Sequence, residues 1–244
     1  MSRHLRYVHP PEVRAFLATV AATAASRARV LTPDIDLWRA QIGGHKEPMF
    51  KTDQIGQLTG PFRPPRMKPI RGIAREGRVN PAGIAYLYLS SNPDTAIAET
   101  RPWIDAAISL GKFRLARDVR IVDCTIGRRK WVPHLEEPSP AERERCVWRD
   151  INEAFARPIV TDESPTEYVP TQVLGDLFQS EGFEGIAFRS SCARGRNLVL
   201  FNTLLADLVR CHLVYTTSLR YKHVWTGAIY NLEDGPPPAS SNER

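Results

Sequence analysis

GRVNPAGIAYLYLSSNPDTAIAE, residues 77–99, joins a glycine-rich turn, an apolar strand and a helix in one short segment. The residues after Gly83 are almost all apolar, as expected of a strand that is buried on both faces. Asn92 and Pro93 then supply an N-cap and a first-turn proline, so a helix is predicted from Pro93 onward. Pro102 should end or kink this helix, because the residue before a proline is disfavoured in the α region. The chain is therefore expected to build its fold around this turn–strand–helix unit.

The other predicted elements are a mixture of helices and strands without a regular β-α alternation. Helices are predicted at residues 11–27, 138–155 and 171–181, and strands at residues 35–42, 84–90, 108–115, 119–124, 185–188, 197–201 and 214–224. Such an order of elements favours the α+β class over a doubly wound α/β fold.

Three parts of the chain differ from this pattern. Residues 1–36 are predicted to form a helical extension that docks on a main domain spanning residues 37–230. Residues 43–69 are rich in Gly, Pro, Lys and Arg, and are predicted to be mostly loop. The tail, residues 231–244, is rich in Pro and Ser and is predicted to be disordered.

The composition limits the function classes without choosing one. The chain has 244 residues, 42% of them apolar, which can support a large core. Its formal net charge of +6 favours an anionic partner, which could be a nucleic acid, a phosphorylated metabolite or an acidic protein. The 4 cysteines and 6 histidines form no metal-ligand spacing, and no run of 18 apolar residues predicts a membrane span. We therefore expect a cytoplasmic protein with reduced cysteines and no bound metal.

Arg78 is the first candidate for chemistry. It lies in the predicted turn between Gly77 and Asn80, where a glycine lets the backbone approach a ligand closely. A guanidinium held there can form a forked hydrogen bond with a phosphate or a carboxylate. Arg71 and Arg75 lie close by in sequence and would add positive charge. The alternative is an ordinary exposed arginine in a turn.

Two tyrosines and one glutamate extend this candidate site. Tyr86 and Tyr88 face the same side of the predicted strand, because side chains alternate with period two. Glu99 falls at the edge of the apolar side of the following helix, near the end where the helix dipole disfavours a negative charge. A carboxylate in such a place indicates either a function or an ion pair, for which Arg101 and Arg78 are the nearest candidates.

A second polar group follows about ninety residues later. Ser190 comes at the end of one predicted strand, and Asn197 begins the next. No Gly-x-Ser-x-Gly elbow surrounds Ser190, so a substrate-binding hydroxyl is expected instead of an acyl-enzyme nucleophile. Ser191 follows directly, so either serine could be the site residue. Both Ser190 and Asn197 could otherwise be ordinary turn residues.

The order and spacing of these motifs resemble the RES-domain family, which is named for an Arg, a Glu and a Ser. The resemblance covers residues 37–230. It implies a fold like that of ADP-ribosyltransferases, with a mixed sheet core and flanking helices. It also implies an enzyme that degrades NAD⁺ by phosphorolysis or hydrolysis, and that is the toxin of a bacterial toxin–antitoxin pair. Its substrates would be NAD⁺ and inorganic phosphate as a possible co-substrate, with no bound cofactor. Its protein partner would be an antitoxin, and it could also form a homodimer. Nucleic acid would be bound only through the antitoxin.

The resemblance also assigns roles to the candidate residues. Arg78 would hold the phosphates of NAD⁺ or the incoming phosphate, Glu99 would stabilise the positive ribose of the transition state, and Ser190 would complete the catalytic group. Tyr88 would pack against the nicotinamide or its ribose, and Ser190 and Asn197 would orient that end of the substrate. The remaining substrate-binding candidates are Arg75, Tyr86 and Ser191.

Two other functions remain open from the sequence. An ADP-ribosyltransferase would share the fold and NAD⁺, but would pass ADP-ribose to a macromolecule. A nucleic-acid-binding module would explain the net charge, although the arginines are dispersed and no recognised binding motif accompanies them.

Overall fold

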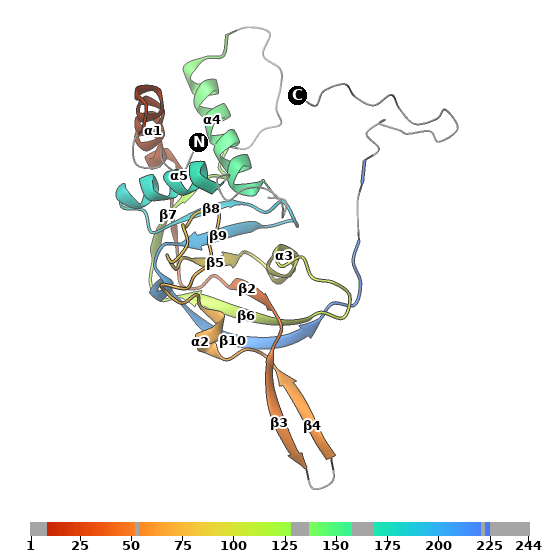
Figure 1. Ribbon diagram of the computed structural model, residues 1–244. Coiled ribbons are helices and arrows are strands. Elements are labelled where there is room, and N and C mark those ends of the chain that lie inside the picture. The colour runs from red at the N-terminus through yellow and green to blue at the C-terminus, as the bar shows by residue number, and fades with distance from the viewer. Residues whose placement is uncertain (1–8, 52–53, 128–136, 158–167, 221–222, 225–244) are drawn as a thin grey trace, which may run out of the picture.

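A single curved sheet organises the chain. The computed structural model describes residues 9–51, 54–127, 137–157, 168–220 and 223–224. Within these residues, eight strands form a mixed sheet in the order β1-β7-β8-β9-β5-β2-β6-β10, and β3 and β4 form a separate hairpin (Figure 1). The α+β class, the mixed sheet and the flanking helices are as predicted.

Most neighbouring strands run antiparallel. The pair β7 and β8 is parallel, and the other pairs of the main sheet are antiparallel. The strands of this sheet are β1 (Ala28–Leu31), β2 (Leu37–Ile42), β5 (Leu87–Ser90), β6 (Ala107–Leu115), β7 (Val119–Asp123), β8 (Gly185–Arg189), β9 (Arg196–Leu200) and β10 (Ala206–Tyr215). The helices are α1 (Pro11–Ala24), α2 (Pro64–Met67), α3 (Pro93–Glu99), α4 (Pro140–Ala156) and α5 (Val169–Ser180), with 3-10 turns at Ala25–Arg27 and Thr203–Leu205.

Alternation along the central strands produces two cores. On β5, Leu87 and Leu89 join one cluster, whereas Tyr88 packs against the other. On β9, Leu198 joins the first of these clusters and its neighbour Val199 the second. The central strands are therefore buried on both faces, as the apolar run of β5 predicted.

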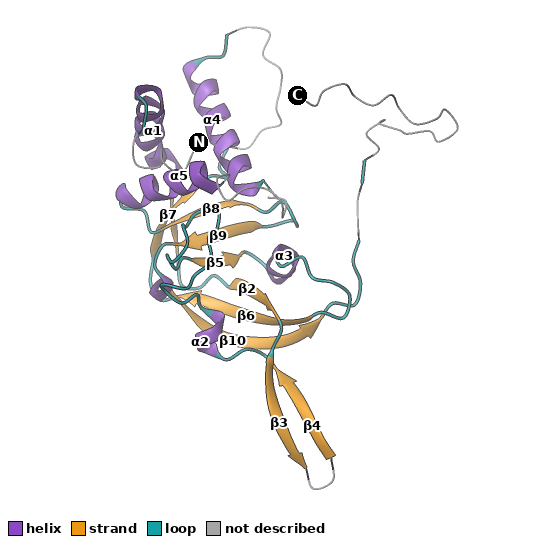
Figure 2. Ribbon diagram, in the orientation of Figure 1, coloured by secondary structure: helices purple, strands orange, loops and turns teal. Residues whose placement is uncertain are grey.

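Helices α1, α4 and α5 cover one face of the sheet at its β7–β8 end (Figure 2). A capping box between Ser139 and Glu142 begins α4. Its buried face carries Trp148, which stacks on Phe178 of α5 with ring centroids 5.9 Å apart. Further along, Phe155 stacks on Phe188 of β8 at 5.4 Å, which fixes this helix to the strand that leads to Ser190.

Helix α3 ends at the residue that the sequence singled out. The Asn92 side chain caps the helix by accepting from the Thr95 amide at 2.8 Å, and the helix ends at Glu99. Arg101, the residue before Pro102, has a φ of 48°, outside the right-handed α region. Trp103 therefore lies beyond the helix and is 60% exposed.

The prediction that residues 43–69 are mostly loop is wrong. Residues 45–60 form a hairpin of β3 (His45–Lys51) and β4 (Gln54–Gly60), which protrudes from the body of the molecule, and α2 follows (Figure 1). The pairing runs without interruption from His45↔Gly60 to Lys51↔Gln54. Pro48 and the glycines hid the strand pattern, but a two-stranded ribbon has free edges, so a residue without an N–H can be accommodated.

Both ends of the domain also differ from the sequence prediction. The first helix ends at Ala24, and residues 28–31 form edge strand β1, so the N-terminal segment supplies a strand as well as a helix. At the other end, β10 spans Ala206–Tyr215, where its pairing with β6 ends, instead of residues 214–224. The predicted tail, residues 231–244, lies outside the described residues. Among the described residues, no helix is long and apolar enough to cross a bilayer.

Gly195 fits a gap that admits no side chain. A Cβ there would overlap Thr95 Oγ1 and lie 2.8 Å from Asn92 Nδ2, so the 190–195 turn packs directly on the start of α3. We expect Gly195→Ala to lower the free energy of unfolding by about 1–3 kcal/mol in urea denaturation. The control is Gly60→Ala, where a Cβ meets nothing within 4 Å and the change should stay below about 0.5 kcal/mol. Equal stability of the two variants would contradict the close packing.

Candidate active site

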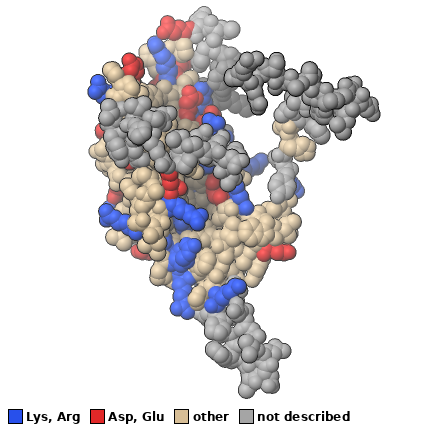
Figure 3. All heavy atoms as spheres, in the orientation of Figure 1, with Lys and Arg blue, Asp and Glu red and all other residues tan. Residues whose placement is uncertain are grey.

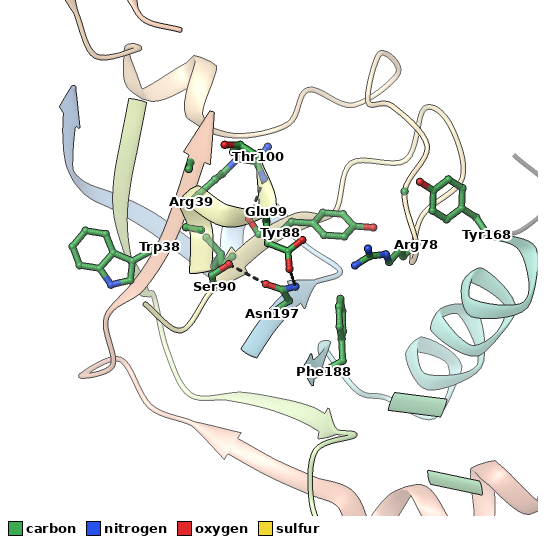
Figure 4. Close-up of a pocket in the computed structure, with 14 residues that line it drawn as sticks. Trp38, Arg39, Arg78, Tyr88, Ser90, Glu99, Thr100, Tyr168, Phe188 and Asn197 are labelled. Carbon is green, nitrogen blue, oxygen red and sulfur yellow. Dashed lines mark hydrogen bonds between the residues drawn. The ribbon is translucent and has the colours of Figure 1, made fainter. Parts of the chain in front are cut away.

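One cavity collects four of the eight predicted site residues. It has a volume of about 310 Å³ and is lined by residues of β2, β5, α3, β8, β9 and the 77–78 turn. Its polar walls carry Arg39, Arg78, Tyr88, Glu99 and Asn197 (Figure 4). The structure thus brings together residues that lie far apart in the sequence, because β5 pairs with both β9 and β2.

The carboxylate of Glu99 is held by two neutral donors. Its Oε1 accepts from Ser190 Oγ at 2.7 Å and from Asn197 Nδ2 at 2.6 Å. Asn197 is itself oriented by Ser90, whose hydroxyl donates to Asn197 Oδ1 at 3.0 Å. The other carboxylate oxygen makes no hydrogen bond within the described residues and faces the side of Tyr88 and Arg78 in Figure 4. One oxygen is therefore anchored, and the other is available to a ligand.

This network distinguishes the two candidate serines. Ser190 is buried, and besides donating to Glu99 it accepts from the amides of Cys192 and Ala193 at 3.1 and 3.2 Å. Ser191 is exposed, and its hydroxyl lies 4.0 Å from Cys192 Sγ. By this geometry Ser190 is a positioning residue for Glu99.

The turn that carries Arg78 is held by the buried side chain of Asn80. Its amide nitrogen donates to the carbonyls of Arg75, Pro81 and Ile84 at 2.8–3.1 Å. Its amide oxygen accepts from the Tyr88 hydroxyl at 2.7 Å. The nitrogen and the oxygen of this buried amide both have their hydrogen-bond partners within the turn and on β5, so the turn has little freedom to rearrange.

Two further contacts complete this anchorage. Gln172 of α5 is fully buried, and its amide donates to the carbonyls of Gly77 and Asn80, each at 3.0 Å. A Cβ at Gly77 would lie 2.7 Å from the Tyr88 hydroxyl oxygen, so only glycine permits this approach. The resulting turn presents Arg78 to the cavity from a rigid base.

The hydroxyl of Tyr88 makes hydrogen bonds with the turn, and Tyr88 also lines the cavity. The hydroxyl oxygen accepts from the Val79 amide at 3.1 Å while its proton goes to Asn80. Burial, the largest cause, raises the pKa of Tyr88 well above its usual range. The hydroxyl therefore stays protonated near neutral pH, and the tyrosine contributes a ring surface instead of an acid or base.

Arg39 is a site residue that the sequence analysis missed. It lines the cavity, its Nη1 donates to the Tyr88 carbonyl at 3.0 Å, and its Nε is buried without a partner. Burial, with a smaller effect of Arg66, lowers the pKa of Arg39 to about 10, so it remains charged at neutral pH. Within the described residues no carboxylate pairs with it. A signal was present, because Arg39 falls two residues after buried Leu37 on the strand, where a core-facing side chain is expected.

The remaining candidates lie away from this cavity. Tyr86 is buried in the core and donates to Gln179 Oε1 at 2.8 Å. Arg75, which is exposed, and Tyr86 line a second cavity, and Ser190 and Ser191 line a third. Within the described residues, no three His, Cys, Asp or Glu side chains are grouped to hold a metal ion. In the first cavity, the hydrogen-bonding and cationic groups suit a polar organic ligand that carries negative charge.

The comparisons with known proteins establish the family. The family model of the RES domain matches residues 36–222, which is more than half of the chain. The chain therefore belongs to the RES-domain family, as the motifs indicated. Among solved structures, the crystal structure of the M. tuberculosis MbcT–MbcA toxin–antitoxin complex matches with 11% identity and a TM-score of 0.42, over 80% of this chain and 92% of that chain. No curated protein matches the sequence.

The anchorage of the Arg78 turn leads to a stability prediction. In Asn80→Asp, an anionic oxygen replaces the donor that faces three carbonyls, whereas Tyr88→Phe removes a single hydroxyl. We expect Asn80→Asp to lower the free energy of unfolding by about 3 kcal/mol or more, and Tyr88→Phe by about 1–2 kcal/mol. Urea denaturation of the two variants measures both. An Asn80→Asp variant as stable as the unsubstituted protein would show that the amide does not hold the turn.

Proposed function

We propose that this RES-domain protein cleaves the bond between nicotinamide and ribose in NAD⁺. The observation that carries the proposal is the state of Glu99, with one oxygen fixed by Ser190 and Asn197 and the other directed to the cavity. A fixed carboxylate stabilises positive charge without having to reorganise during the reaction. Cleavage of an N-glycosidic bond creates such a charge on the ribose.

The proposed chemistry needs no acid for the leaving group. The electron pair of the C1′–N bond moves to the ring nitrogen of nicotinamide, which leaves as a neutral molecule. The ribose becomes oxocarbenium-like and is stabilised by Glu99. An oxygen of phosphate or water then forms the new bond at the same carbon, which is numbered C1″ in ADP-ribose, giving ADP-ribose 1″-phosphate, or ADP-ribose and a proton.

The two cations in the first cavity support an anionic substrate. In the view of Figure 4, Glu99 lies between Arg39 on one side and Arg78 on the other. Arg39 is the stronger argument, because its Nε is buried and no carboxylate within the described residues pairs with it, which is costly until an anion binds. These residues would hold the phosphates of the dinucleotide, or an incoming phosphate.

We further propose that the protein acts as the toxin of a toxin–antitoxin pair, as the resemblance to RES proteins implies. Depletion of NAD⁺ would stop growth, and an antitoxin protein would restrain the enzyme. The solved complex of MbcT with MbcA is an example of a toxin held by its antitoxin.

The central test is nicotinamide release from NAD⁺ by the purified protein, with and without inorganic phosphate. We expect Glu99→Gln, which keeps the shape but removes the charge, and Arg78→Ala to lower kcat/KM at least about 100-fold. The controls are Glu181→Gln and Arg210→Ala, which change the same residue types at exposed positions outside the first cavity. Release that requires phosphate identifies a phosphorylase, and release without it a hydrolase.

Two outcomes would overturn the proposal. If the folded protein releases no nicotinamide under any of these conditions, NAD⁺ degradation is ruled out as its function. Release only when a macromolecular acceptor is added would indicate an ADP-ribosyltransferase instead.

A second test uses cells. We expect expression of the protein alone to lower cellular NAD⁺ and to arrest growth, and expression of Glu99→Gln at the same level to do neither. The measurement is NAD⁺ content beside growth rate. Growth arrest that persists with the Glu99→Gln variant would show that the toxicity does not depend on the proposed cleavage of NAD⁺.

A further inference from the structure

A second cavity lies directly beside the first. It has a volume of about 800 Å³ and shares four lining residues with the first cavity, which are Arg39, Gly77, Tyr88 and Thr100. The two cavities are therefore adjacent, and the Arg39 and Tyr88 side chains form part of the wall that they share. A volume of about 310 Å³ is at the lower end of the range for small-molecule sites, so the first cavity alone is small for a dinucleotide.

The walls of the second cavity are basic. Besides Arg39 they carry Arg66, Lys68 and Arg75, with Glu76 as the acidic residue. Lys68 is paired with Asp207 at 2.9 Å, and Arg66 donates to Gln41 Oε1 at 2.6 Å. Arg75 is exposed and makes no ion pair within the described residues. Basic side chains also gather below the central hollow in Figure 3, toward α2 and the base of the β3–β4 hairpin.

The same cavity has an exposed apolar wall. Ile70, Ile73 and Ile84 line it and are 56%, 74% and 43% exposed. Large aliphatic side chains grouped in a polar depression leave apolar surface in contact with water, which a flat ligand would cover with a gain in free energy. Cations beside an apolar wall match a purine base that carries a phosphate.

From these features we infer that the second cavity binds the adenosine monophosphate half of NAD⁺, with the nicotinamide mononucleotide half in the first cavity. This inference rests on the proposed function. The adenine packs against Ile73 and Ile84, and the phosphate next to the adenosine lies toward Arg75. Arg39, which lines both cavities, is placed for the diphosphate that connects the two halves.

A third cavity is the competing location. It is lined by Arg189, Arg194, Arg196 and Arg220, so it is also basic. It shares no lining residue with the first cavity, and it contains no large aliphatic or aromatic side chain. It could attract an anion, and Ser190 on its wall donates to Glu99, but it offers no apolar surface for the base.

Truncated substrate provides the test. Nicotinamide mononucleotide retains the bond to be cleaved and lacks the adenosine monophosphate half, so kcat/KM is measured for both compounds. We expect the unsubstituted protein to prefer NAD⁺ by about tenfold or more. Arg75→Ala and Ile73→Ala should lower kcat/KM for NAD⁺ by about tenfold and change that for the mononucleotide by less than about twofold. Calorimetry with adenosine monophosphate should show binding that Arg75→Ala weakens by a similar factor.

Matched controls lie on the exposed part of β10. Arg210→Ala and Val209→Ala make the same kinds of change outside the cavities and should affect neither substrate. Equal rates for both substrates, or an unchanged NAD⁺ rate in both cavity variants, would overturn the inference and leave the cavity to another occupant, such as a protein segment. Failure of the unsubstituted protein to cleave either compound would instead overturn the proposed function, so the two failures are distinguishable.

Discussion

The site depends on the buried amide of Asn80. Its nitrogen satisfies three carbonyls of one turn, and its oxygen accepts the hydroxyl of Tyr88 from β5. Gln172 of α5 secures the same turn from the other side. A buried polar group costs free energy unless its partners are all present, so this network permits one arrangement of the turn and excludes the alternatives. The position of Arg78 follows from that constraint, because the turn is joined to both the sheet and the helical layer.

The carboxylate opposite this turn is fixed by a different part of the chain. Glu99 lies at the end of α3, and its partners Ser190 and Asn197 come from the end of β8 and from β9. Sheet pairing brings them together, because Ser90 at the end of β5 lies opposite Asn197. Close packing of Gly195 on Thr95 keeps the 190–195 turn against α3. The two halves of the site therefore have separate supports, and each support uses hydrogen bonds from uncharged donors.

Local sequence signals predicted the parts of the site that one segment encodes. The Asn92 cap, the strand through Tyr88 and the end of α3 near Glu99 are confirmed, because capping and alternation act within a few residues. The β3–β4 hairpin, strand β1 and the end of β10 were not predicted, because each is decided by a partner strand. Arg39 falls on the same face of its strand as Leu37, but that alternation alone did not identify it as a site residue. A charge on a strand gains meaning only when its surroundings are known, and the sequence does not reveal that a carboxylate is absent.

The charges of the site fit the proposed reaction in a specific way. Arg39 and Arg78 are cations, and Glu99 is the acidic residue of the first cavity. In the cleavage of NAD⁺ the phosphates keep their charge throughout, whereas the ribose gains positive charge only as the bond breaks. The arginines would therefore bind substrate and transition state equally, and Glu99 would bind the transition state better. Only the second kind of interaction accelerates the chemical step. In the proposed reaction, the anchorage of Glu99 by Ser190 and Asn197 would therefore matter for turnover, and Arg39 for the selection of an anionic substrate.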